Sequence, residues 1–90
     1  MAVKLELFYS PICPLCPRVK ELVMGLDDKV LDNVQVEEVN VYSSEGLKRA
    51  EGYGIRSVPA IVLNGKIKLT GVPTRSTLVN AVQRELGGKT

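Results

Sequence analysis

The alternation of apolar and polar side chains predicts strand, helix and strand in the first half of the chain. Within residues 3–9, Val3, Leu5 and Leu7 alternate with the charged Lys4 and Glu6, which is the period-two pattern of a half-buried strand. From Cys13 onward apolar side chains recur at helical spacing, so we expect a helix of about four turns that ends near residues 32–33. Residues 34–42 are rich in valine and predict a second strand, in which the Glu37-Glu38 pair shifts the alternation and allows a bulge.

The second half of the chain predicts a short helix and a hairpin. Ser43 or Ser44 can cap the short helix, and Gly54 supplies its end. Residues 58–63 form an apolar strand entered through a proline, and residues 66–70 alternate again. The Asn-Gly pair between these two runs is the strongest short-range signal for a β-hairpin.

A last helix completes the α/β pattern of the chain. Thr74 can cap it, four apolar side chains lie on one face, and Gly87-Gly88 ends it. The predicted order is β-α-β-α-β-β-α, in which the helical crossover makes the first two strands parallel and the hairpin makes the last two antiparallel. We therefore expect one mixed four-stranded sheet with helices on both faces.

Composition and charge describe an ordinary globular domain. The chain has 90 residues, of which 44% are hydrophobic and 24% charged, so residues 1–90 are expected to form a single domain. The net charge of +2 comes from scattered Lys and Arg, which gives no support to a nucleic-acid or membrane partner. No apolar stretch approaches the roughly 18 residues of a membrane span, and residues 1–4 contain no apolar region of the kind expected in a cleavable signal. We expect a cytoplasmic protein.

The candidate chemistry lies in the only two cysteines of the chain, Cys13 and Cys16. Two cysteines three positions apart cannot form the disulfide framework of a small secreted domain. The chain has no histidine, which excludes Cys-His catalysis, imidazole acid-base chemistry and histidine metal sites. A pairing of these cysteines would therefore serve chemistry.

The strand-to-helix junction predicts unequal reactivity for the two thiols. We expect Cys13 at the N-cap, Pro14 at the first helical position and Cys16 at the third. The free N–H groups of Leu15 and Cys16, together with the helix dipole, would then favour a Cys13 thiolate. Such settings lower the pKa of cysteine from about 8.5 to about 3.5–7.5, whereas Cys16 should stay protonated.

Residues three apart on a helix lie side by side, so the two cysteines can form a disulfide without backbone rearrangement. A loop this short would stabilise the fold by only about 2 kcal/mol, which suits a redox switch better than a structural staple. Zinc would need two more Cys or His ligands, which the chain lacks. An inert pair, and a metal or iron-sulfur site shared between two chains, remain alternatives.

Three segments together carry a family resemblance. They are residues 9–16 (Tyr-Ser-Pro-Ile-Cys-Pro-Leu-Cys), residues 53–59 (Tyr-Gly-Ile-Arg-Ser-Val-Pro), and Gly71 ahead of the final helix. With these segments in this order, the chain resembles the thioredoxin/glutaredoxin superfamily along nearly its whole length. The resemblance implies the thioredoxin fold, with strand order 2-1-3-4 and an antiparallel third strand.

The resemblance also implies a mechanism without a bound cofactor. Cys13 would attack a substrate disulfide as the nucleophile, and Cys16 would resolve the mixed disulfide and leave an internal Cys13–Cys16 disulfide. Pro59 would be cis and lie beside the cysteines, so that the main chain of Val58 can hold an extended substrate segment. The substrate-binding residues implied in this way are Pro14, Leu15, Val58, Pro59 and Gly71.

The two halves of the chain resemble different branches of the superfamily. Cys-Pro-Leu-Cys looks like the glutaredoxin motif, but the lysine that precedes that motif is missing, and residues 71–74 lack the paired glycines and aspartate that grip glutathione. The second half looks like thioredoxin, although the tryptophan before the first cysteine is absent. The buried aspartate and lysine of thioredoxin would fall near Leu7 and Asn40. Small archaeal-type members of the superfamily share this hybrid character.

From these features we expect a monomeric reductase of protein disulfides, recharged by a flavoenzyme of the thioredoxin-reductase type. A glutathione-coupled glutaredoxin is the first alternative. A metal or iron-sulfur module that uses the two cysteines across a dimer is the alternative from another class.

Overall fold

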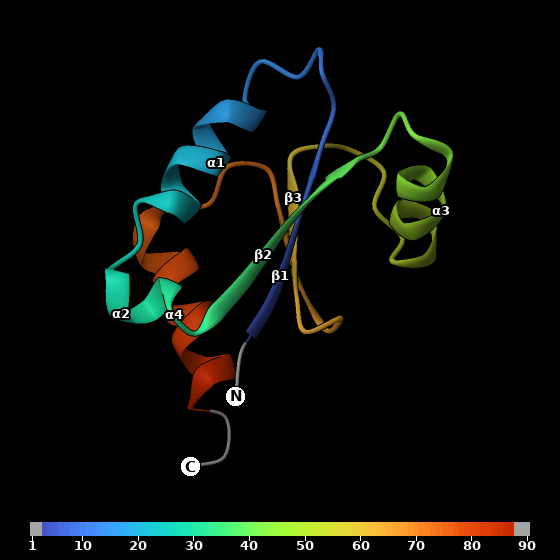
Figure 1. Cartoon of the computed structure of the whole chain (residues 1–90). Helices are drawn as coiled ribbons and strands as arrows, with labels where there is room; N and C mark the ends of the chain where they lie inside the picture. The colour runs from blue at the N-terminus through green and yellow to red at the C-terminus, as the bar shows by residue number, and fades with distance from the viewer. Residues whose placement is uncertain (1–2, 88–90) are drawn as a thin grey trace.

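The computed structural model of the chain describes residues 3–87, which form four strands and four helices around one sheet (Figure 1). In chain order these elements are β1 (Val3–Tyr9), α1 (Cys16–Met24), α2 (Asp28–Leu31), β2 (Val34–Asn40), α3 (Ser44–Gly52), β3 (Ala60–Leu63), β4 (Ile67–Thr70) and α4 (Arg75–Leu86).

The sheet has the predicted strand order, β2-β1-β3-β4. β1 and β2 are parallel, whereas β3 pairs antiparallel with both β1 and β4. Figure 1 shows α1, α2 and α4 on one side of the sheet and α3 on the other. The fold class expected from the sequence, a mixed sheet covered on both faces, is confirmed.

Two hydrophobic clusters fill the two sides of the sheet. Leu5 and Leu7 of β1 pack with residues of α1 and α4, while Phe8 of β1 packs with Val39 and Ala50 under α3. Because both faces of β1 are covered, its burial does not follow the half-exposed pattern expected from the sequence. Glu6, which we expected on the exposed side, is only 1% exposed.

The first helix is shorter than its apolar spacing predicts. α1 ends at Met24 with Gly25 as its C-cap, and Asp27 starts the separate helix α2 by accepting the N–H of Lys29 at 3.5 Å. The apolar period continues across this break because Leu26 is buried in the same cluster as α1. The helical spacing of the apolar residues therefore indicated a shared buried face and not one continuous helix.

The second strand is regular and ends early. Its register with β1 is unbroken, so the bulge allowed by Glu37-Glu38 is absent from the pairing of β1 with β2. β2 is one of the two edge strands, and both glutamates are exposed. The strand stops at Asn40 because its side chain accepts the N–H of Tyr42 at 2.8 Å and turns the chain.

The predicted caps and turn are confirmed. Ser43 caps α3 by accepting the N–H of Gly46 at 3.0 Å, and Thr74 caps α4 in the same way. Asn64 and Gly65 have φ of 52° and 70°, the left-handed geometry of a tight hairpin turn. β3 and β4 begin slightly later than expected, and the expected stop at Gly88 lies outside the described residues.

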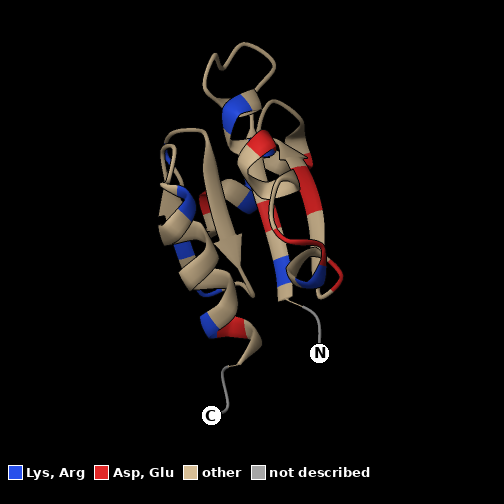
Figure 2. Cartoon of the chain, turned by 90° about the vertical axis from the view of Figure 1, so that its left-hand side faces the viewer, with Lys and Arg blue, Asp and Glu red and all other residues tan. Residues whose placement is uncertain are grey.

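Charged residues of both signs occur on the helices and strands visible in Figure 2. Among residues 3–87, no helix has the length and apolar character that crossing a bilayer requires.

Candidate active site

The sheet brings the residues singled out from the sequence to one of its ends. Phe8 at the end of β1 is paired with Ala60 at the start of β3, and Ala60 is paired with Thr70 at the end of β4. The loop after β1, the loop before β3 and the loop after β4 therefore meet at the upper end of the molecule in Figure 1. Cys13, Pro59 and Gly71 lie in these three loops.

Cys13 and Cys16 form a disulfide, with their Cα atoms 5.5 Å apart. This separation lies within the usual range for a disulfide. Cys16 is 5% exposed, whereas Cys13 is partly exposed. The pair thus consists of one partly exposed cysteine and one buried cysteine.

The expected helix positions of the two cysteines are wrong. α1 begins at Cys16, and its N-cap is Leu15, which makes no side-chain cap. The carbonyl of Leu15 accepts the N–H groups of Arg18 and Val19 at 3.1 and 3.3 Å, so the helical hydrogen bonds begin there. Cys13 precedes Pro14, which disfavours helical geometry at Cys13. Cys13 lies in the loop and donates its N–H to the carbonyl of Ser10 at 3.2 Å.

The two N–H groups that we expected to stabilise Cys13 are unpaired. The N–H groups of Leu15 and Cys16 donate no hydrogen bond to any atom of residues 3–87. A thiolate close to these two N–H groups would be stabilised by them, as at other helix N-termini.

The loops before β3 and after β4 supply the remaining predicted residues. The Val58–Pro59 peptide bond is cis, the geometry that the resemblance implied, and the carbonyl of Pro59 accepts the N–H of Gly71 at 2.9 Å. Pro59 is buried and Val58 partly buried. Neither the N–H nor the C=O of Val58 makes a hydrogen bond within the described part of the chain. Gly71 adopts a φ of 74°, which favours glycine at this turn.

Exposed apolar side chains surround the cysteines. Ile12 is 74% exposed and Leu15 is 45% exposed, and Pro14 between them is also exposed. A cavity of about 250 Å³ adjoins Val58 on the α3 side; Tyr42 and Leu47, which contribute to its wall, are largely exposed. Exposed apolar surface around a reactive group is typical of a site that binds another polypeptide.

A second cavity, of about 320 Å³, adjoins both cysteines. It is lined by Leu7, Tyr9, Ser10, Pro11, Cys13, Cys16, Pro17, Lys20 and Glu38. Leu7 is thus at the site, but Asn40, the other position suggested by the resemblance, does not line the cavity.

The charges of this cavity come instead from an ion pair that we did not single out from the sequence. Lys20 Nζ lies 3.2 Å from Glu38 Oε2. The sequence feature that could have identified Glu38 was its spacing from Val34 and Val36, which places all three side chains on one face of β2.

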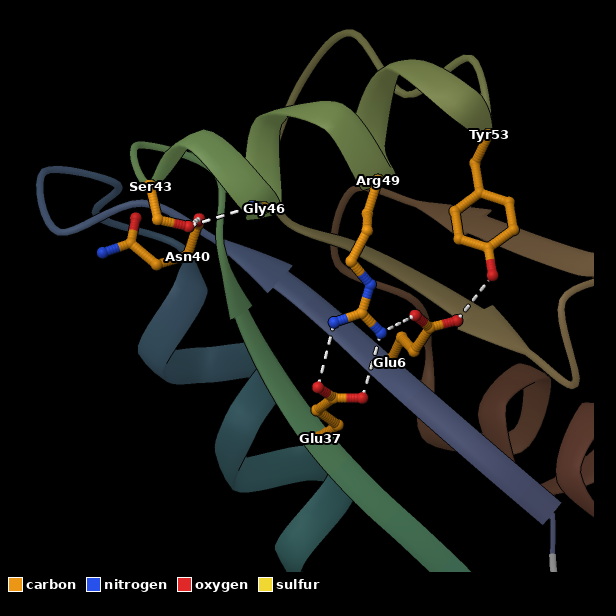
Figure 3. Close-up of polar contacts among 7 residues, drawn as sticks. All are labelled: Glu6, Glu37, Asn40, Ser43, Gly46, Arg49 and Tyr53. Carbon is orange, nitrogen blue, oxygen red and sulfur yellow. Dashed lines mark hydrogen bonds and ion pairs between the residues drawn. The ribbon is translucent and has the colours of Figure 1, made fainter.

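A polar network around the buried Glu6, also missed, holds α3 against the sheet (Figure 3). Arg49 pairs with Glu37 through two hydrogen bonds of 2.9 and 3.0 Å and also contacts Glu6, while the hydroxyl of Tyr53 donates to Glu6 at 2.9 Å. The hydrogen bond to Glu6 raises the pKa of Tyr53, and the hydrogen bond from Arg49 lowers the pKa of Glu37. Tyr53 therefore fixes the start of the segment that leads to Pro59.

No cluster of three or more His, Cys, Asp or Glu side chains that could hold a metal ion occurs within residues 3–87.

Known proteins are similar to the chain in sequence. A family model described as a thioredoxin domain matches residues 1–83. The thioredoxin of Methanocaldococcus jannaschii is 44% identical over 84 residues, which cover 93% of this chain and 96% of the relative. A probable thioredoxin of Archaeoglobus fulgidus is 39% identical over 89 residues, covering 97% of this chain and 93% of the relative.

Solved structures share the fold. The crystal structure of a thioredoxin from Malassezia sympodialis matches with a TM-score of 0.75 and 24% identity, over 91% of this chain and 73% of that one. A mutant thioredoxin from Halobacterium salinarum matches with a TM-score of 0.70 and 24% identity, over 90% of this chain and 72% of that one.

Proposed function

The chain belongs to the thioredoxin family, and from this premise we propose that it reduces protein disulfides by dithiol exchange, with Cys13 as nucleophile and Cys16 as resolving thiol. Family membership makes the protein a thiol-disulfide oxidoreductase. The observation that carries the assignment of roles is the unequal exposure of the two paired cysteines, since Cys13 is partly exposed and Cys16 is buried.

In the first step the Cys13 thiolate attacks one sulfur of a substrate disulfide. A mixed disulfide between Cys13 and the substrate forms, the substrate S–S bond breaks, and the other substrate sulfur leaves as a thiolate that takes up a proton. The unpaired N–H groups of Leu15 and Cys16 support this role because they favour the anionic sulfur that attacks.

In the second step Cys16 attacks Cys13 Sγ. The Cys13–Cys16 bond forms, the bond to the substrate breaks, and two electrons have passed from the dithiol to the substrate. The burial of Cys16 supports this order because it favours attack from within the protein over reaction with a second substrate.

The substrate segment is proposed to lie extended along Val58. Its main chain would pair with the free N–H and C=O of Val58, as a strand adds to an open edge. Pro14, Leu15, Pro59 and Gly71 are proposed to form the surrounding contact surface, and the cavity beside Val58 can take an apolar substrate side chain.

For the electron donor we propose a flavoenzyme of the thioredoxin-reductase type, with the protein acting as a monomer in the cytoplasm. The absence from residues 71–74 of the paired glycines and aspartate implied for glutathione binding supports this choice over glutathione. A hydroxyethyl-disulfide assay with glutathione and glutathione reductase tests it, because turnover there would favour the glutaredoxin alternative.

Insulin reduction followed by turbidity tests the assignment of the cysteines. We expect Cys13→Ser to abolish activity and Cys16→Ser to accumulate a mixed disulfide with insulin that dithiothreitol releases. A Cys13→Ser variant that still reduced insulin would refute the proposed roles.

A further inference from the structure

An ion pair and the buried cysteine line the same cavity beside the disulfide. Cys16 and Lys20 are four residues apart in α1, so their side chains are neighbours on one face of the helix. Lys20 reaches across to Glu38 on β2, with 3.2 Å between Nζ and Oε2. All three residues line the same cavity of about 320 Å³.

The position of Glu38 is unusual for its strand face. Glu38 is paired in register with Leu7, and the preceding residues of this face, Val34 and Val36, pack against the core beneath α1 and α4. The apolar side chains at positions 34 and 36 are thus followed on this face by a carboxylate at position 38, near the end of β2 and at the cavity that the cysteines line. Glu37 is on the opposite face and bonded to Arg49, so it cannot serve the cavity.

The second step of the proposed mechanism needs a proton acceptor at this place. A free thiol with a pKa of about 8.5 is a poor nucleophile at neutral pH until it loses its proton. Besides the cysteines, the ionisable groups that line the cavity are Tyr9 from β1, Lys20 from α1 and Glu38 from β2. A phenol and an ammonium ordinarily keep their protons at neutral pH, which leaves the carboxylate as the acceptor.

We propose that Glu38, oriented by Lys20, accepts the proton of Cys16 through cavity water during the second step; this proposal rests on the proposed function. A cavity of this volume has room for several waters, since each occupies about 30 Å³ in the liquid. The Cys16 proton passes to Glu38, the Cys16 thiolate attacks Cys13 Sγ, and the departing substrate thiolate is reprotonated from Glu38 or solvent. Glu38 thereby acts as the proton acceptor through water, and Lys20 is the residue that positions it.

Stopped-flow reaction of the reduced protein with 5,5′-dithiobis(2-nitrobenzoate) separates the two steps. Attack by Cys13 releases a first thionitrobenzoate at a rate proportional to reagent concentration. Attack by Cys16 on the mixed disulfide releases a second at a rate independent of concentration. The rates are measured from pH 6 to pH 10 in the wild type, in Glu38→Gln and in Glu37→Gln, which removes an equal charge from the opposite face of the same strand.

We expect Glu38→Gln to slow the second release about tenfold near pH 6.5 and to leave the first release within about twofold. This effect is below the usual 10²–10⁴-fold of general-base catalysis because the Glu38 side chain is 42% exposed and bulk water competes. The difference between wild type and Glu38→Gln in the rate of the second release should vanish near pH 10, where Cys16 ionises without a protein base. A second release that is unchanged, slowed equally at all pH values, or slowed equally by Glu37→Gln would overturn the proposal.

Failure of the proposed function gives a different result. A first release that persists at the wild-type rate in Cys13→Ser would reject Cys13 as the nucleophile. A normal first release that disappears in Cys13→Ser, combined with a second release insensitive to Glu38, would reject the proton transfer alone.

Discussion

Replacing Arg49 with methionine tests how the sheet holds α3 and the segment that leads to Pro59. Arg49 is the cation that faces Glu6, a carboxylate with a side chain only 1% exposed. Methionine keeps the helix propensity and much of the apolar length of arginine, so the substitution mainly removes the charge and the hydrogen bonds. Glu6 would retain its hydrogen bond from Tyr53.

The expected loss of stability follows from the burial of Glu6. Removing one partner of a buried ion pair typically costs about 3–5 kcal/mol because the other charge stays buried without compensation. Arg49 is 25% exposed and Tyr53 still donates to Glu6, so we expect the lower end, about 3 kcal/mol. At about 4–8 °C per kcal/mol for a domain of this size, Tm should fall by about 12–24 °C.

Urea and thermal unfolding followed by circular dichroism measure this loss, and Arg56→Met is the matched control. Arg56 is exposed and forms no ion pair within residues 3–87, so its replacement should change stability by less than about 0.5 kcal/mol. In a double-mutant cycle of Arg49→Met with Glu6→Gln, the losses in free energy of unfolding should depart from additivity by about 1 kcal/mol or more. An Arg49→Met variant as stable as Arg56→Met, or an additive cycle, would refute the reasoning.

Two further substitutions test α3 and its network. Gly46→Ala would place a Cβ 1.9 Å from the Asn40 carbonyl oxygen, so it should destabilise the protein by about 2 kcal/mol in urea unfolding; Gly52→Ala, which meets no atom within 4 Å, should not. Because its pKa is raised in the folded state, Tyr53 contributes stability that is present below its ordinary pKa of about 10 and lost as pH rises through the raised value. Tyr53→Phe should therefore flatten the fall in stability between pH 9 and 11, and an unchanged slope would contradict the role of the Glu6 hydrogen bond.

Local signals in the sequence predicted most of the fold because each is contained in a few neighbouring residues. Ser43 and Thr74 cap helices with their own side chains, and Asn64 and Gly65 adopt the turn that their residue types favour. The strand order followed from the family resemblance. It also agrees with the general rules for helical crossovers and hairpins.

The errors arose where burial depends on distant parts of the chain. Glu6 alternates with apolar neighbours like a solvent-facing residue, but it is buried and contacted by Arg49 of α3 and by Tyr53 at the C-cap of α3. Leu26 continued the apolar period of α1 because it shares the same core, although the helix had already ended at Met24.

The site was predictable in its cysteines but not in its finer geometry. Cys13 and Cys16 could be identified from their spacing alone. The start of α1 at Cys16 depended on hydrogen bonds to the Leu15 carbonyl, which the spacing does not encode. The approach of Lys20 to Glu38 requires the relative placement of α1 and β2, elements far apart in sequence.

We infer that the loop between β1 and α1 stabilises a reactive sulfur anion at Cys13. This inference is tested most directly by the rate of alkylation of each cysteine in the reduced protein, measured against pH. Iodoacetamide labelling, with tandem mass spectrometry to distinguish the two positions, gives a separate titration for each thiol. The account predicts that Cys13 reacts first, with a midpoint below the value of about 8.5 for free cysteine, while Cys16 is protected. A Cys13 that titrates like free cysteine, or a Cys16 that reacts before it, would contradict the account.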